Sequence, residues 1–73
     1  MPVYESIEYT PHALTRMKDR RITKADVELT LRLGEGRPAR RDKWFFELGH
    51  IRVVVVEFEQ SARVVTVIRL RGM

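Results

Sequence analysis

The chain contains no cysteine and no asparagine, and it has only one glutamine among its 73 residues. Without cysteine it forms no disulfide, which fits a reducing compartment. The longest apolar run, Val53–Val56, is far too short to cross a bilayer. Glu5, Glu8 and Pro11 interrupt the first apolar residues, whereas a signal peptide needs an unbroken apolar stretch. We therefore expect a cytoplasmic protein.

The length predicts a single domain over residues 1–73, with a small core. A domain of this size buries only about 60% of the surface that its unfolded chain exposes. Two histidines without cysteine do not complete a structural zinc site, so a second chain, as in a homodimer, is the expected supplement to stability. The shortage of amide and thiol side chains, beside 33% charged residues, favours a thermophilic source.

Positive charge is in excess. Fourteen Lys and Arg stand against ten Asp and Glu, which gives a net charge of +4 and an isoelectric point near 10.1. This excess favours RNA or an acidic protein as the partner. A charged surface that serves only solubility is the alternative.

The first half of the sequence predicts a short edge strand and a helix. Val3–Tyr9 alternates loosely, as an edge strand does. Thr10 is a suitable N-cap, and Pro11 occupies the first helical position, where its missing N–H costs nothing. We expect this helix to end near Arg20 or Arg21.

A second helix is expected directly afterwards. Thr23 is its N-cap, and Asp26 stands three residues later as a short relative of the capping-box Glu. Gly34 and Gly36 end the helix, and the basic segment Arg37–Lys43 is expected to form a mobile loop.

The second half predicts three antiparallel strands. They are expected at Trp44–Leu48, His50–Glu59 and Arg63–Arg71, with turns at Gly49 and at residues 60–62. The middle strand is apolar on both faces at Val53–Val56, which indicates a central position. Strict alternation places Arg63 and Arg69 on the same face of the last strand. The expected fold is α+β, with two N-terminal helices packed on one face of a three- to four-stranded antiparallel sheet.

Three side chains that suit RNA chemistry recur at every fourth position of the first helix. His12, Arg16 and Arg20 fall within roughly 80° of one another at about 100° per residue. The helix N-terminus favours a neutral imidazole, so we predict His12 as the general base and Arg16 and Arg20 as the phosphate clamp. The separate apolar stripe consists of Ala13, Leu14 and Met17. A surface histidine without a role, beside ordinary ion-pairing arginines, is the alternative.

RNA cleavage through the 2′-hydroxyl also needs an acid for the leaving 5′-oxygen, but it needs no metal ion or other cofactor. His50, at a predicted hairpin turn, and Lys43 are the candidates for the acid. A zinc ion held by His12 and His50 with Glu5 or Glu57 is the alternative chemistry.

Further RNA contacts are expected from basic residues in the second half. These residues are Arg40, Arg41, Lys43 and Arg69. The neighbouring Trp44, Phe45 and Phe46 suit either base stacking or a core, and in so small a domain the core is the more common use.

The motif H-x-x-x-R-M-x-x-R-x-I, from His12 to Ile22, resembles the bacterial domain-of-unknown-function family 4258. Thr10-Pro11 before the motif, Asp26-Val27 after it and a late Val64–Val67 extend the likeness over nearly the whole chain. Members are grouped with the RelE and barnase-like small ribonucleases, many of them toxins of toxin–antitoxin pairs. The resemblance implies that His12, Arg16 and Arg20 are the residues that matter most for function. Where such proteins often carry an aromatic residue in the last strand, this chain has Ile68.

Two functions from different classes follow. The first is a metal-independent endoribonuclease of toxin type, partnered by an acidic antitoxin that covers the His12 face. The second is a non-catalytic module that binds RNA or a protein partner, in which the same cations only neutralise phosphates. A structural homodimer that pairs through an apolar strand edge is a third possibility.

Overall fold

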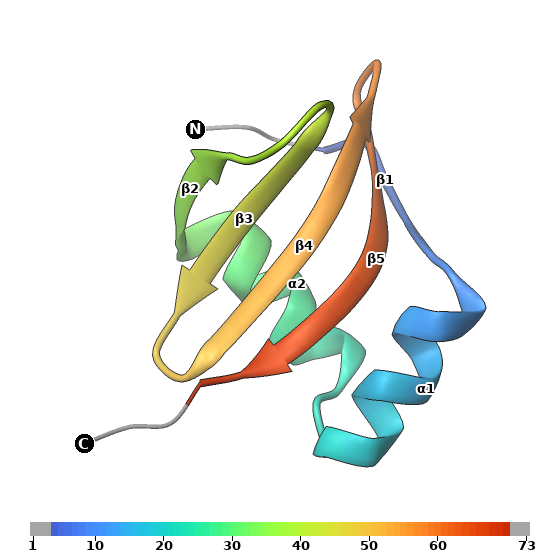
Figure 1. The fold of residues 1–73 in the computed structure, drawn as a ribbon, viewed down its shortest axis with the longest axis vertical. Coiled ribbons are helices and arrows are strands. Elements are labelled where there is room, and N and C mark those ends of the chain that lie inside the picture. The colour runs from blue at the N-terminus through green and yellow to red at the C-terminus, as the bar shows by residue number, and fades with distance from the viewer. Residues whose placement is uncertain (1–3, 71–73) are drawn as a thin grey trace.

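The computed structural model describes residues 4–70 and shows two helices and one five-stranded sheet (Figure 1). The elements are β1 (Ser6–Tyr9), α1 (Pro11–Arg20), α2 (Lys24–Leu33), β2 (Glu35–Pro38), β3 (Lys43–Leu48), β4 (Ile51–Phe58) and β5 (Ser61–Arg69). Neither helix is long and apolar enough to span a membrane.

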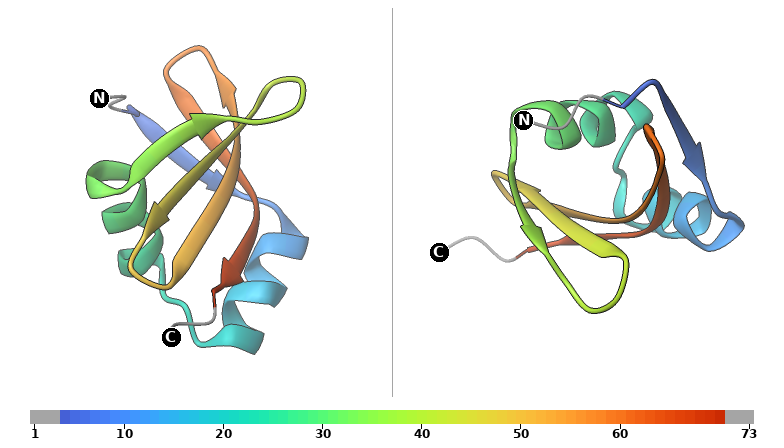
Figure 2. Two further views of the ribbon diagram at one scale, coloured as in Figure 1. Left: turned by 60° about the vertical axis from the view of Figure 1, so that its left-hand side comes forward. Right: turned by 90° about the horizontal axis from the view of Figure 1, so that it is seen from above.

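The strands lie in the order β1-β5-β4-β3-β2. In Figure 1, α2 lies behind the sheet and α1 lies beside β5, and Figure 2 gives two further views of this arrangement. Buried residues of both helices belong to one core with residues of β3, β4 and β5. The expected α+β class, the helices on one face, the edge position of β1 and the central position of β4 are therefore confirmed. The sheet itself differs from the expectation, because β1 pairs with β5 in parallel and the sheet is mixed. Val3 and Arg71, at the ends of two predicted strands, lie outside the described residues.

Strand β2 was missed, because its sequence reads as a helix end followed by a loop. Gly36 pairs with Phe46, and a Cβ at Gly36 would lie 2.7 Å from the Phe46 ring. Glycine is therefore needed here for close packing of an edge strand, and Pro38 is tolerated because an edge strand leaves N–H positions unpaired. The expected mobile loop is a hydrogen-bonded turn, in which the Lys43 N–H donates to the Arg40 carbonyl at 3.2 Å.

Both helices begin as their capping residues predict. Thr10 Oγ1 accepts from the Ala13 N–H at 3.0 Å, and Thr23 Oγ1 accepts from the Asp26 N–H at 3.1 Å. The Asp26 carboxylate accepts in turn from the Thr23 N–H at 3.0 Å, which completes the capping box. Gly34 ends α2, and a Cβ there would lie 2.5 Å from the Glu47 carbonyl oxygen of β3.

We expect Asp26→Asn to destabilise the protein near neutral pH but not in acid. Hydrogen bonds from the backbone and side chain of Thr23 lower the pKa of Asp26, and Arg69 lowers it further. A carboxyl group with a lowered folded-state pKa stabilises the fold above its unfolded pKa, and this contribution disappears as the pH falls through the folded value. The melting temperature of the variant should therefore lie below that of the wild type at pH 7, and the gap should close between about pH 5 and pH 2. A gap that stays constant in acid would contradict this role of the carboxylate.

The core lies between the helices and the sheet. Its buried members are Ala13, Met17, Ile22, Val27, Leu31, Phe46, Val53, Val55, Ala62, Val64 and Val67. The one buried polar side chain named among the described residues is Thr30, and its hydroxyl donates to the Asp26 carbonyl at 2.8 Å. That hydrogen bond removes the cost of burying the hydroxyl group.

Strand β5 contains an irregularity that reverses the direction of its last side chains. Val54 pairs with Thr66 and Val55 pairs with Val64, so Val65 is an extra residue, as in a β-bulge. Val64 and Val67 are both buried in the core although they are three residues apart. Arg63 and Arg69 therefore lie on opposite faces of β5, and the expectation of one shared cationic face was wrong. The strand also begins at Ser61, so the turn is shorter than expected.

Candidate active site on helix α1

Helix α1 is fixed to β5 at its N-terminal end. The Thr10 N–H donates to the Val64 carbonyl at 3.1 Å, and the Thr10 hydroxyl donates to the Val65 carbonyl at 3.4 Å. Ala13 and Met17 point into the core. His12 and Arg16 directly precede these two residues. Because the helix turns by about 100° per residue, they lie beside its core-facing side rather than opposite it.

The structure brings His12 and Arg16 together at the surface. His12 is exposed, Arg16 is half-buried, and Arg16 Nε donates to His12 Nε2 at 3.4 Å. Because a guanidinium can only donate, His12 Nε2 is the acceptor of this hydrogen bond. The pair offers a base and a cation within reach of one phosphodiester group.

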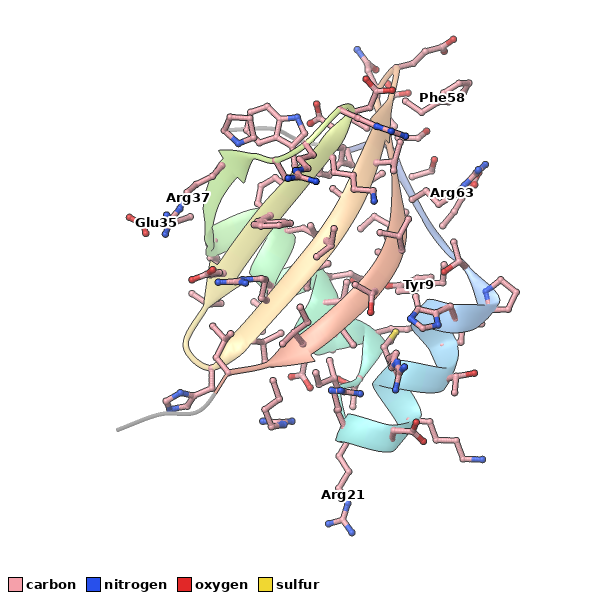
Figure 3. The ribbon with its side chains drawn as sticks, viewed as in Figure 1. Tyr9, Arg21, Glu35, Arg37, Phe58 and Arg63 are labelled. Carbon is pink, nitrogen blue, oxygen red and sulfur yellow. The ribbon has the colours of Figure 1, made fainter. Side chains whose placement is uncertain are left out.

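Arg20 continues this row one turn later and is half-buried. Its backbone carbonyl accepts two hydrogen bonds from Arg69, at 2.9 and 3.2 Å. Arg21 does not join the row, because it ends the helix in a left-handed conformation with a φ of 56°. Figure 3 shows its side chain extending away from the sheet. We define the α1 face as His12, Arg16 and Arg20.

Neither predicted acid is placed beside His12. His50 lies in the β3–β4 turn, and its carbonyl accepts from the Leu70 N–H at 2.6 Å, beyond the end of β5. The C-terminal end of α1 lies beside the end of β5, where Arg69 bonds to Arg20. His12 lies at the N-terminal end of this ten-residue helix, about 15 Å away. Lys43 begins β3 and pairs with Val56, so β4 and β5 separate it from α1.

The other predicted RNA contacts fall into two groups. Arg40 and Arg41 occupy the exposed β2–β3 turn, next to Lys43. This turn lies at the opposite end of the sheet from Arg69, because Lys43 is in register with Val56 whereas Arg69 is in register with Ile51. The first group therefore forms a separate basic patch, which we call the β2–β3 patch (Arg40, Arg41 and Lys43).

The aromatic strand divides its side chains between the two faces of the sheet. Phe46 is buried, and Trp44 stacks on it with ring centroids 6.2 Å apart. Phe45 is half-buried on the opposite face, where the Arg52 guanidinium lies 5.2 Å from its ring centroid. Trp44 and Phe46 thus belong to the core side, and Phe45 to the uncovered face.

Two tyrosines have a raised pKa. Burial and the hydrogen bond to Glu57 (2.6 Å) raise that of Tyr4, and burial and the charge of Glu28 raise that of Tyr9. The Tyr9 hydroxyl is buried without a hydrogen-bond partner, and the Lys24 ammonium lies 5.1 Å from its ring centroid. Both phenols therefore stay protonated at neutral pH.

No group of three or more His, Cys, Asp or Glu side chains suited to a metal ion occurs in residues 4–70. The four residues of the alternative zinc site do not form such a group. Of the residues that shape the candidate site, sequence reasoning missed the second role of Thr10, its bonds to β5. Nothing local to Thr10 signals those bonds, because the partner carbonyls lie more than 50 residues away.

Comparisons with known proteins agree with this fold. A chain of the crystal structure of the toxin–antitoxin complex RelBE2 from Mycobacterium tuberculosis matches with a TM-score of 0.70 and 20% sequence identity, over 94% of this chain and 99% of that one. The shared fold is the RelE-like α+β fold that was expected. No curated protein sequence matches the chain. The family model described as Domain of unknown function (DUF4258) matches residues 9–69, which include the whole α1 face. The chain belongs to the DUF4258 family, as the motif from His12 to Ile22 indicated.

Proposed function

We propose that the α1 face cleaves RNA without a metal ion, as a ribonuclease of toxin type. The observation that carries the proposal is the 3.4 Å contact between Arg16 Nε and His12 Nε2 on an exposed helix face. This contact supports the proposal, because an imidazole suits general-base catalysis and a neighbouring guanidinium suits the binding of phosphate. The RelE-like fold and the positive net charge support the same function.

The reaction proceeds through the 2′-hydroxyl of the substrate. When Arg16 turns from His12 to the bound phosphate, His12 Nε2 takes the proton of this hydroxyl, and the O2′ atom attacks the adjacent phosphorus. The P–O5′ bond breaks as the O2′–P bond forms, which leaves a 2′,3′-cyclic phosphate and a 5′-hydroxyl end. Arg16 and Arg20 stabilise the negative charge that develops on the phosphoryl oxygens.

The leaving 5′-oxygen takes its proton from water, and the imidazolium then returns its own proton to solvent. General acid catalysis contributes about 10²–10⁴-fold where an enzyme supplies it. Because neither of the two predicted acids, His50 and Lys43, lies beside His12, we expect slow turnover.

We expect Arg16→Ala to lower the cleavage rate by about 10- to 100-fold, because it removes the cation nearest to the base. The melting temperature should change by less than about 2 °C, since the hydrogen bond recorded for the guanidinium among residues 4–70 goes to the exposed His12. Cleavage of a single-stranded RNA oligonucleotide in EDTA, followed on a gel, measures the rate.

Lys18→Ala is the matched control, because it removes one positive charge from the same helix but from an exposed position outside the α1 face. It should keep most of the wild-type rate. Equal losses in the two variants would reduce the role of Arg16 to net charge, and a large fall in the melting temperature of Arg16→Ala would mark the side chain as structural.

The β2–β3 patch favours a second candidate function, binding of RNA without cleavage. Its three cations are exposed, and no ion pair of theirs is recorded within the described part of the chain. Such a protein would bind RNA with an affinity that falls steeply with salt and would leave the strand intact.

We also propose an acidic antitoxin as the protein partner, bound over the basic α1 face. The matched structure is a toxin–antitoxin complex, and a net charge of +4 complements an acidic chain. Bound in this way, the partner would keep RNA from His12.

A further inference from the structure

Arg69 is the last residue of β5, and its guanidinium binds the C-terminal end of α1. Nη2 donates to the Arg20 carbonyl at 2.9 Å and to the Arg21 carbonyl at 3.3 Å, and Nε donates to the Arg20 carbonyl at 3.2 Å. The last carbonyls of a helix have no partner within the helix, and they form the negative end of its dipole. A guanidinium bonded to these carbonyls supplies their missing hydrogen bonds and places a positive charge at the negative end of the dipole.

The irregularity at Val65 is what directs Arg69 to this position. With strict alternation, Arg69 would share a face with Arg63, which pairs with Glu8 at 3.2 Å on the side away from the helices. The extra residue moves Arg69 to the helix side instead. The bond from the Thr10 N–H to the Val64 carbonyl continues the parallel pairing of β1 with β5, and the neighbouring Val65 carbonyl accepts from the Thr10 hydroxyl.

Helix α1 is therefore bonded to β5 at both ends. Its ten residues span about 15 Å, and the five steps from Val64 to Arg69 span about 17 Å of strand, so the two lengths match. Ala13 and Met17 are the buried residues of α1, and the last turn has no buried residue beyond Met17. Ile22, two residues after Arg20, is buried in the core, so Arg69 holds the last turn of α1 together with the packing of Ile22.

We propose that Arg69 is a positioning residue of the α1 face, which acts through the Arg20 backbone and does not itself contact RNA. It holds the last turn of α1, so that the Arg20 guanidinium stands in line with Arg16 and His12. This proposal rests on the proposed function for its effect on RNA. A displacement of about 1 Å at a reacting group costs on the order of 100-fold in rate, so the last turn needs such an anchor.

A double-mutant cycle on RNA binding tests the proposal. We expect Arg69→Met to weaken binding of a single-stranded RNA oligonucleotide about as much as Arg20→Met, because both variants lose the Arg20 contact. In the Arg20→Met background, Arg69→Met should change neither the affinity nor its salt dependence. If Arg69 bound a phosphate itself, the two losses would multiply and the slope of log K against log salt would fall by about a further 0.7, which would overturn the proposal.

Hydrogen exchange supplies a readout that needs no RNA. The Arg21 and Ile22 N–H groups donate to the carbonyls of Lys18 and Met17 at the end of α1. In Arg69→Met these two amides should exchange about tenfold faster, while those of α2 stay unchanged, and Arg69→Lys should restore part of the protection. Unchanged exchange at the end of α1 would overturn the proposal. If the wild type neither binds nor cuts RNA, the proposed function fails, but the exchange data still decide whether Arg69 holds the helix.

Discussion

His12→Ala should lower the rate of RNA cleavage by about 10²–10⁴-fold, the usual contribution of a general base. The fold should survive the change, because His12 is exposed and its recorded hydrogen bond is the one from Arg16. Exposed positions away from caps and buried networks tolerate substitution within about 0.5 kcal/mol. The rate on a defined single-stranded RNA and the melting temperature of the same preparation measure the two effects.

Thr15→Ala is the control for this prediction. Thr15 is exposed on the same helix, and the hydrogen bond recorded for its hydroxyl within the described part of the chain goes to the Pro11 carbonyl at 3.1 Å, one turn earlier. This variant should cut RNA at the wild-type rate. If His12→Ala were equally active, the proton acceptor would have to lie elsewhere, and the proposed mechanism would be wrong.

Phe46→Ala should remove a large part of the free energy of unfolding. The ring is 1% exposed, stacks against Trp44, and meets the Tyr4 ring edge-on at 6.2 Å. Truncating a buried phenylalanine costs about 3–5 kcal/mol, and a domain of this length has only about 4–11 kcal/mol of stability in total. Gly36 lies directly against the ring, so the β2–β3 pairing would also lose its packing surface. Urea denaturation measures the loss.

Phe45→Ala is the matched control, because it makes the same change one residue earlier on the opposite face. Phe45 is half-buried, and no helix covers it. Its truncation should cost about 1–2 kcal/mol, chiefly the lost contacts with the Arg52 guanidinium and the neighbouring strand. Equal losses of stability in the two variants would contradict the assignment of Phe46 to the core side of the sheet.

Local signals in the sequence predicted the helices. The capping pairs Thr10–Ala13 and Thr23–Asp26 act over three residues, so they can be recognised without tertiary information. The run Val53–Val56 predicted the central position of β4, although helices cover only one face of the sheet: Val53 and Val55 lie in the core, and Val54 is buried on the other face, where it pairs with Phe45. β2 was missed because glycine and proline usually indicate a loop. The sequence does not show that Gly36 packs against the Phe46 ring or that Pro38 lies in an edge strand.

For the candidate site, too, the local contact was predicted and the long-range contact was not. The neighbours His12 and Arg16 were predicted, because residues four apart on a helix lie on one face. The bond from Arg69 to the Arg20 carbonyl was not, since the two residues are 49 positions apart and the contact depends on one extra residue in β5. The RNA roles of Arg40, Arg41 and Lys43 stay predictions, now placed in a patch remote from α1.

The ends of the cleavage products decide whether the α1 face is a metal-independent ribonuclease. Wild-type protein at micromolar concentration is incubated with a single-stranded RNA oligonucleotide in EDTA, and the products are identified by mass spectrometry. Fragments with 2′,3′-cyclic phosphate and 5′-hydroxyl ends, formed by the wild type but not by His12→Ala, are the expected result. Intact RNA, or fragments that the two proteins yield equally, would contradict it.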